Sequence, residues 1–189
     1  MWRNMMNRAI FLDRDGTINQ DRGYIHKPSE FIFEYRAIEA ISLLNQAGFI
    51  VIVVSNQAGI AHGHFSEQAV DCLHQWVSGQ LALHGARIDA FYYCPHHPNG
   101  QSRYRTKCDC RKPAPGMLLR AAADFSIDLA ASWMVGDHRS DMEAGTAAGV
   151  TPVFVLTGHG KQELPHIATS TRQAENLYEA VTKHILVLA

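Results

Sequence analysis

The chain has 189 residues, and its 17 Lys and Arg residues nearly balance its 18 Asp and Glu residues, for a formal net charge of −1. Apolar residues make up 47% of the chain and charged residues 19%, which excludes a disordered chain and predicts one globular domain over residues 1–189. The balanced charge argues against a surface that binds nucleic acid or anionic membranes as a whole.

Short apolar runs alternate with segments of helical periodicity. The runs at 9–12 and 49–54 predict buried strands, and the apolar spacing over 36–46 predicts a helix between them. Ser66 is the expected N-cap of a helix that reaches about residue 84. The later expected elements are a strand at 91–93, a helix at 115–125, a strand at 133–135, a helix at 141–148, a strand at 151–156 and a helix at 175–186. This alternation predicts a mainly parallel α/β sheet covered on both faces.

Polar residues stand where the predicted strands end, which is where open α/β sheets bind ligands. Asp13 and Asp15 follow the first strand two residues apart, so an extended backbone points both carboxylates to one side. Paired carboxylates attract a hard divalent cation, and Gly16 permits a tight turn beside them. The alternative is an ordinary solvated turn.

Residues at the other strand ends favour the cation site. Taken singly, Ser55 is a turn residue, Lys112 a surface lysine and Asp137 a helix cap. Together with Asp13 they supply a nucleophilic carboxylate, a metal site and groups that bind an anion. Phosphoryl transfer requires this set, because it depends on positioning and on neutralising oxygen charge.

Four short motifs, in this order and spacing, resemble those of the haloacid dehalogenase-like (HAD-like) phosphatases. They are DRDGT at 13–17, SNQAG at 55–59, RKP at 111–113 and GDHRSD at 136–141. The resemblance covers residues 9–160 and implies a Rossmann-like, doubly wound sheet and an aspartyl-phosphate mechanism. The intervals between the motifs leave no room for a large cap domain.

The resemblance also implies a role for each polar residue. Asp13 would be the nucleophile, and Asp15 the general acid and then the general base. Mg²⁺ would be held by the Asp13 carboxylate, the Asp15 backbone carbonyl and Asp137. The phosphoryl oxygens would be held by Ser55, the Asn56 amide and Lys112, while Asp141 would orient the metal shell or Lys112.

Targeting signals are not evident in the sequence. No apolar run approaches the roughly 20 residues that span a bilayer, and the first residues, MWRNMMNR, hold no apolar core of a secretory signal. We therefore expect a cytoplasmic protein with no membrane partner. In that compartment its four cysteines are thiols or metal ligands rather than disulfides.

The polar stretch at 95–111 is the longest segment without a helix or strand pattern. Cys94, His96, Cys108 and Cys110 lie in or beside it and form a Cys₃His set, which is typical of structural zinc. A zinc ion would order this loop, residues 94–110, which has few apolar side chains. Free thiols near a histidine are the alternative, and His97 competes with His96, which the family pattern favours.

The zinc loop narrows the resemblance to two families. CPHHP, CDCRKP and the compact chain resemble the D-glycero-D-manno-heptose 1,7-bisphosphate 7-phosphatases and the histidinol-phosphate phosphatases. Departures from the pattern occur at Ala58, at His62 and at 35–36, all at the substrate rim. By position the resemblance implies substrate contacts at Asp21, Arg22, Gly23, Tyr24, Ser55, Asn56, Gln57, Ala58, Arg111, Lys112 and His138.

Arg111 and Lys112 are neighbours, so their side chains should diverge in an extended segment. Lys112 would face the transferred phosphoryl group. Arg111 has a planar fork that suits phosphate and would meet a second phosphate. The alternative is that Arg111 braces the zinc loop. His159 follows the last expected strand and could reach the site.

The function that the resemblance implies is removal of the 7-phosphate of D-glycero-D-manno-heptose 1,7-bisphosphate, a small phosphorylated sugar, in lipopolysaccharide-core synthesis. The alternatives are a histidinol-phosphate phosphatase of histidine biosynthesis and a polynucleotide 3′-phosphatase, which the missing basic surface disfavours. A non-catalytic, zinc-stabilised binding module is the alternative from another class, and the intact acidic residues argue against it. We expect a monomer.

Overall fold

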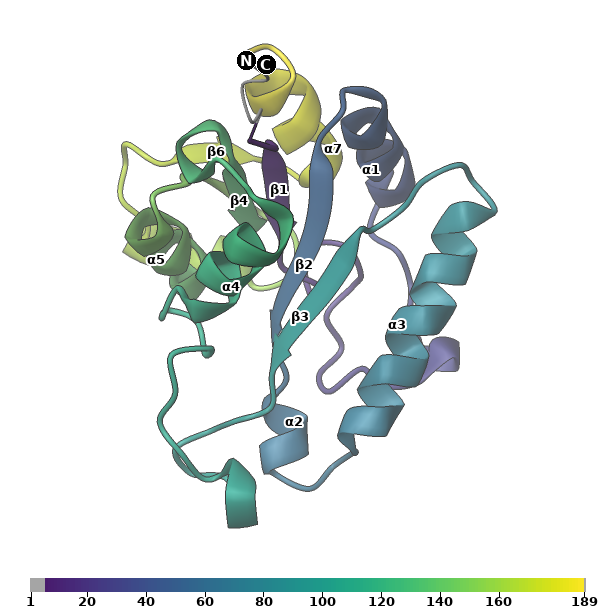
Figure 1. Cartoon of the computed structure of the whole chain (residues 1–189), viewed down its shortest axis with the longest axis vertical. Coiled ribbons are helices and arrows are strands. Elements are labelled where there is room, and N and C mark those ends of the chain that lie inside the picture. The colour runs from purple at the N-terminus through teal and green to yellow at the C-terminus, as the bar shows by residue number, and fades with distance from the viewer. Residues whose placement is uncertain (1–5, 189) are drawn as a thin grey trace.

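The computed structural model describes residues 6–188. The expectation about an N-terminal signal concerns residues 1–5 in part, and these lie outside that range. The described residues form a parallel sheet of six strands in the order β3-β2-β1-β4-β5-β6 (Figure 1). The strands are β1 (Ala9–Leu12), β2 (Ile50–Asn56), β3 (Ala90–Cys94), β4 (Trp133–Gly136), β5 (Thr151–Val155) and β6 (Arg172–Ala174). The predicted doubly wound α/β sheet is confirmed, and every pairing is parallel.

The sheet is buried on both faces, as a parallel sheet requires. Side chains of β1 alternate between two cores: Ile10 and Leu12 face one, and Phe11 faces the other. The first core lies under α1 (Ala37–Gln46), α3 (Glu67–Ala82) and α7 (Leu177–Ala180), and the second under α4 (Gly116–Phe125) and α5 (Arg139–Ala148). Figure 1 shows these two helix layers on either side of the sheet.

The predicted element ends differ from the observed ends by a few residues, for local reasons. Ser66 caps α3 as expected, since its Oγ accepts from the Ala69 N–H at 3.2 Å. The helix expected from 36 begins at Ala37, because Arg36 has a left-handed backbone (φ 56°). The strand expected to end at 54 runs on to Asn56, so Ser55 lies inside β2 and not after it.

Several short elements were not expected from the sequence. The final helix, expected over 175–186, is α7 followed by a π-helical turn at Val181–Ile185. The sheet gains β6, and two further short helices are present, α2 (Ala58–Ala61) and α6 (Gly160–Glu163). Four 3₁₀ turns complete the described part of the chain, at Pro28–Glu30, Ser102–Tyr104, Leu129–Ala131 and Leu164–His166. Within residues 6–188, no helix has both the length and the apolar character to cross a bilayer.

The strand register brings the motif residues to one edge of the sheet. Leu12 pairs with both Val53 and Val135, so the residues after β1, β2 and β4 meet there. The Asp13 N–H donates to the Val135 carbonyl at 2.9 Å, which continues the ladder beyond β1. This edge, together with α2 and the loop after β3, forms the lower end of the molecule in Figure 1.

Candidate active site

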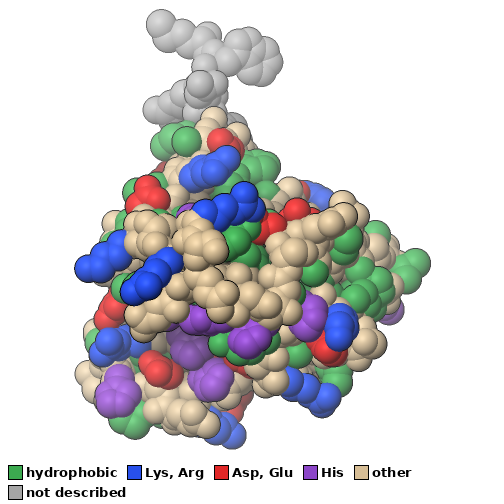
Figure 2. Space-filling view, turned by 90° about the horizontal axis from the view of Figure 1, so that it is seen from below, with side chains coloured by type: hydrophobic (Ala, Val, Ile, Leu, Met, Phe, Trp, Pro, Cys, Tyr) green, Lys and Arg blue, Asp and Glu red, His purple; other side chains and the backbone are tan. Residues whose placement is uncertain are grey.

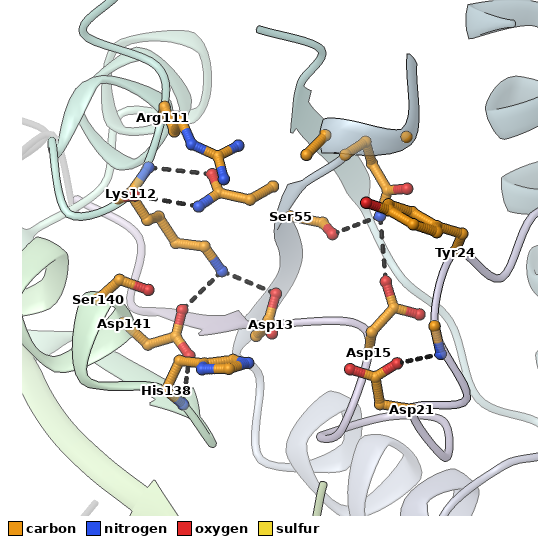
Figure 3. Close-up of a pocket in the computed structure, with 15 residues that line it drawn as sticks. Asp13, Asp15, Asp21, Tyr24, Ser55, Arg111, Lys112, His138, Ser140 and Asp141 are labelled. Atoms are coloured by element: carbon orange, nitrogen blue, oxygen red, sulfur yellow. Dashed lines mark hydrogen bonds and ion pairs between the residues drawn. The ribbon is translucent and has the colours of Figure 1, made fainter. Parts of the chain in front are cut away.

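Lys112 lies at the centre of the site and is buried (Figure 3). Its ammonium group is 2.7 Å from Asp13 Oδ1, 2.7 Å from Asp141 Oδ1 and 2.7 Å from the Val54 carbonyl. Burial alone would lower the pKa of Lys112, but the two carboxylates outweigh it and hold the pKa above its usual value. Lys112 therefore stays a fixed positive charge beside Asp13.

Three buried carboxylates surround this one cation. Oxygens of Asp13, Asp137 and Asp141 lie within 4.8 Å of one another. Burial raises the pKa of Asp13 to about 7 and that of Asp137 to about 9, and the neighbouring acid Asp141 adds to both shifts. Lys112 alone would not balance three ionised carboxylates, so without a further cation the cluster resists full ionisation.

A divalent cation fits this acidic cluster. Asp137 Oδ2 accepts from the His159 N–H at 2.8 Å, but the buried Asp137 Oδ1 has no hydrogen-bond partner among residues 6–188. A buried, unpartnered carboxylate oxygen in an excess of negative charge is what an oxygen-seeking ion such as Mg²⁺ would satisfy. Asp141 is already held by Lys112 and by the His138 N–H, which donates to its Oδ2 at 3.0 Å.

Glycines allow the acids to approach the backbone this closely. Gly16 has a left-handed backbone (φ 82°), and a Cβ there would overlap the Asp137 carboxylate. A Cβ at Gly136 would overlap the Asp141 carboxylate. The glycines that follow β1 and end β4 are thus required by the neighbouring side chains.

Asp15 is oriented by a separate set of donors. Arg14 Nη2 lies 2.9 and 2.7 Å from its two oxygens, and Asn19 Nδ2 donates to it at 3.0 Å. Gln57 Nε2 donates to Asp15 Oδ2 at 3.1 Å and to Ser55 Oγ at 2.8 Å. The Asp15 carboxylate is therefore outside the acidic cluster, so only its backbone carbonyl is left as the expected metal ligand.

Arg14 and His74 support Asp15, and neither was expected from the sequence to do so. The Arg14 guanidinium is buried, donates to the Ile25 carbonyl at 2.8 Å and lies 3.4 Å from His74 Nε2. Burial, helped by Arg14, lowers the pKa of His74 to about 3, so the ring is a neutral acceptor. The sequence did hold an indication that His74 is buried, since it follows Leu73 on the buried side of the predicted helix.

A cleft of about 430 Å³ opens above these residues. All of the expected substrate contacts line it except Arg22. Asp21 Oδ1 accepts from the Gly23 N–H at 2.7 Å, an Asx turn that places Arg22 at the corner, where its guanidinium donates to Gln20. Gly59 and Ser140 line the cleft without having been expected there, and Asp141 lines it beside Lys112.

Two of the expected phosphate ligands have other partners as well. The Asn56 side-chain amide donates to the Lys112 carbonyl and accepts from the Lys112 N–H. Arg111 lines the cleft, and its Nη1 donates to the His96 carbonyl at 3.1 Å. The sequence left two alternatives for Arg111, facing the cleft or bracing the zinc loop, and the structure shows it doing both.

The zinc-loop residues converge as a four-membered cluster. The Cys110 sulfur is 3.0 Å from that of Cys94 and 3.1 Å from that of Cys108, and His96 Nδ1 is 3.4 Å from Cys110. Tetrahedral zinc with Zn–S bonds of about 2.3 Å holds its ligand atoms at comparable separations. His97 Nδ1 instead accepts from the Asn99 N–H at 3.1 Å. The residues present fit a structural zinc ion.

Comparison with known proteins places this site in a family. Residues 109–180 match a family model described as HAD-hydrolase-like. The chain is 46% identical over 171 residues to a D-glycero-beta-D-manno-heptose-1,7-bisphosphate 7-phosphatase of Photorhabdus laumondii, covering 89% of this chain and 88% of the relative. It is 51% identical over 152 residues to the enzyme of that name from Escherichia coli K12, covering 79% of this chain and 80% of the relative.

A solved structure supports the same family. The crystal structure of D,D-heptose 1,7-bisphosphate phosphatase from B. bronchiseptica, complexed with magnesium and phosphate, superimposes with a TM-score of 0.87 at 35% identity and covers 96% of this chain and 99% of that one. These similarities exclude the non-catalytic binding module. The chain is a phosphoric monoester hydrolase and belongs to the heptose-1,7-bisphosphate 7-phosphatase family of HAD-like hydrolases.

Proposed function

We propose that this enzyme removes the 7-phosphate of D-glycero-beta-D-manno-heptose 1,7-bisphosphate through a phosphorylated Asp13. The observation that carries the proposal is the position of Asp13, at the floor of the cleft and 2.7 Å from the fixed cation Lys112. The substrate follows from the relatives, whose names state that activity at 46% and 51% identity.

The reaction begins at Asp13. A carboxylate oxygen of Asp13 attacks phosphorus, and the bond from phosphorus to the sugar oxygen breaks. Lys112, the Ser55 hydroxyl and backbone N–H groups beside Asn56 hold the phosphoryl oxygens as charge develops on them. Because Lys112 is already anchored between two carboxylates, it needs no rearrangement when the reaction occurs.

Asp15 handles the protons in both steps. In the first it protonates the departing sugar oxygen. In the second it takes a proton from the water that attacks phosphorus, which breaks the Asp13–phosphate bond and releases inorganic phosphate. The Arg14, Asn19 and Gln57 contacts fix the carboxylate for these transfers.

Two metal ions complete the proposal. Mg²⁺ would be held by the Asp13 carboxylate, the Asp15 carbonyl and Asp137, and when bound it neutralises charge on the phosphoryl oxygens. The related enzyme from B. bronchiseptica forms a complex with magnesium and phosphate, which supports this assignment. Zn²⁺ would be held by the zinc loop through Cys94, His96, Cys108 and Cys110 and would serve structure alone.

We also propose the domain organisation, oligomeric state, pathway and compartment of this enzyme. Residues 1–189 act as one catalytic domain and a monomer, and the product feeds lipopolysaccharide-core synthesis. The cysteines of the Cys₃His set must stay reduced to hold zinc, which favours a reducing compartment, so we propose the cytoplasm.

A substrate panel tests this proposal. We expect kcat/KM for heptose 1,7-bisphosphate to exceed that for histidinol phosphate, since the latter offers one phosphate and no counterpart for Arg111. A higher kcat/KM for histidinol phosphate would replace the substrate but keep the chemistry.

The nucleophile is tested by Asp13→Asn, with phosphate release as the measurement. An amide cannot form the acyl phosphate, so activity should fall by several powers of ten while the chain stays folded. Turnover above about 1% of the unmodified enzyme would show that Asp13 is not the nucleophile.

A further inference from the structure

A third group of metal-ligating side chains lies at the rim of the cleft, next to the acidic cluster, where His138 Nε2 is 4.0 Å from Asp137 Oδ2. We call Asp21, His138 and His159 the rim cluster; their ligand atoms lie within 4.8 Å of one another. His159 Nε2 is 3.1 Å from Asp21 Oδ2, and the rings of His138 and His159 are 4.9 Å apart between centroids. The three residues come from the loops after β1, β4 and β5.

The two histidine side chains of the rim cluster are partly exposed, and Asp21 and His159 are each anchored through another atom. The side chains of His159 and His138 are 46% and 39% exposed. The second oxygen of Asp21 accepts from the Gly23 N–H, and the backbone N–H of His159 donates to Asp137. Among residues 6–188, Asp21 forms no ion pair with Lys or Arg, so no fixed cation occupies the site.

We propose that the rim cluster binds a divalent transition-metal ion, with Zn²⁺ as the expected ion. Two imidazoles and one carboxylate suit zinc and other first-row transition metals. Mg²⁺ and Ca²⁺ prefer oxygen ligands and are disfavoured by the two ring nitrogens. The rim cluster therefore differs in metal preference from the all-oxygen acidic cluster beside it.

An ion in the rim cluster would face the cleft. Three protein ligands leave coordination positions open, and because Asp21 and His138 line the cleft, those positions can take water or a phosphate oxygen. Figure 3 shows both residues on the side of the cleft away from Arg111. Histidines also gather on the face in Figure 2, which is the end of the molecule that carries the site.

Zinc uptake tests the site directly. Protein with one zinc per chain, confirmed by elemental analysis, is titrated with Zn²⁺ by calorimetry in excess Mg²⁺. We expect one further equivalent to bind and the midpoint of thermal unfolding to rise. His159→Gln should weaken that uptake by at least about 10-fold, since loss of even an outer-shell partner costs that much. His84→Gln, an exposed histidine beyond the end of α3, is the matched control and should bind as the unmodified chain does.

Asp13→Asn separates the rim cluster from the acidic cluster. The extra equivalent should persist in this variant, because Asp13 is not a rim ligand. The proposal is wrong if the unmodified chain binds no further zinc, if the uptake is as strong in His159→Gln, or if it is lost in Asp13→Asn. The measurement is metal uptake and not turnover, so it stands whichever phosphate ester proves to be the substrate.

Discussion

The side chain of Asn56 forms two hydrogen bonds with the backbone of Lys112, donating to its carbonyl at 3.0 Å and accepting from its N–H at 3.0 Å. The end of β2 thereby fixes the residue whose ammonium group meets Asp13. Because the two residues are 56 positions apart, this contact joins the second motif of the chain to the third.

Asn56→Ala is expected to slow turnover more than it destabilises the fold. Two lost hydrogen bonds cost about 1–3 kcal/mol in the free energy of unfolding, while a shifted Lys112 should lower kcat roughly 10- to 100-fold. Asn45 is the matched control: it makes the same pair of contacts with the backbone of Arg87, far from the cleft. Asn45→Ala should lose stability and keep kcat, and equal kcat values in the two variants would contradict the positioning role.

His74 is expected to act on Asp15 through Arg14. His74→Leu removes the acceptor facing Arg14 Nη1, so kcat and its pH profile should change, whereas His74→Gln keeps an acceptor and should retain more activity. Steady-state rates across pH, with urea unfolding of each variant, separate positioning from stability. If Leu and Gln variants lose the same activity, the acceptor is irrelevant to catalysis.

The lowered pKa of His74 has its own effect on stability. Between pH 6.5 and about 3 the unfolded chain binds a proton at this residue that the folded chain does not bind. Stability from this group is therefore complete above pH 6.5 and is lost as the pH falls, with a slope of up to about 1.4 kcal/mol per pH unit. The difference in unfolding free energy between the unmodified chain and His74→Gln should show this slope, and a difference independent of pH would contradict it.

Zinc removal should act on stability before chemistry. Cys108→Ser breaks the Cys₃His set, so bound zinc and the midpoint of thermal unfolding should both fall. Cys72→Ser is the control, since Cys72 is exposed on α3 and far from the cluster. Elemental analysis and thermal unfolding of both variants provide the measurement, and equal zinc contents in the two would refute the assignment.

Substitutions of Arg111 and Lys112 should have different effects on KM and kcat. Arg111→Ala is expected to raise KM for the bisphosphate more than it lowers kcat, because it removes binding shared by ground and transition states. Lys112→Ala should do the reverse. Measurement with a monophosphate and the bisphosphate identifies the second-phosphate role: an equal loss for both would leave Arg111 only as a brace of the His96 carbonyl.

The fold was largely predictable from the sequence because buried parallel strands are continuous apolar runs. The same reason explains the strand that was missed. β6 has the sequence Arg-Gln-Ala, lies at the sheet edge and pairs with β5 alone, so it carries no apolar run. The π-helical turn after α7 was likewise hidden, since its apolar spacing is close to that of a regular helix.

Only the site residues that lie directly after the parallel strands could be predicted from the sequence. Asp13 and Asp137 meet because parallel strands place their carboxyl ends at one edge. Contacts between distant segments carry no such signal: Arg14 and His74 are 60 positions apart, and only the folded chain brings them together. Arg22 does not line the cleft, because the Asx turn at Asp21 decides which way its side chain points.

The two adjacent cations of the site, Arg111 and Lys112, are held in place by different parts of the molecule. Lys112 is tied to the sheet through Asn56, whereas Arg111 is tied to the carbonyl of His96, a member of the Cys₃His set. Loss of zinc would therefore weaken substrate binding by displacing Arg111, while Lys112 would keep its position beside Asp13. On the proposed zinc assignment, an enzyme without zinc would be less stable and would also need more substrate to approach its maximal rate, so zinc supply would influence the substrate level at which this step runs.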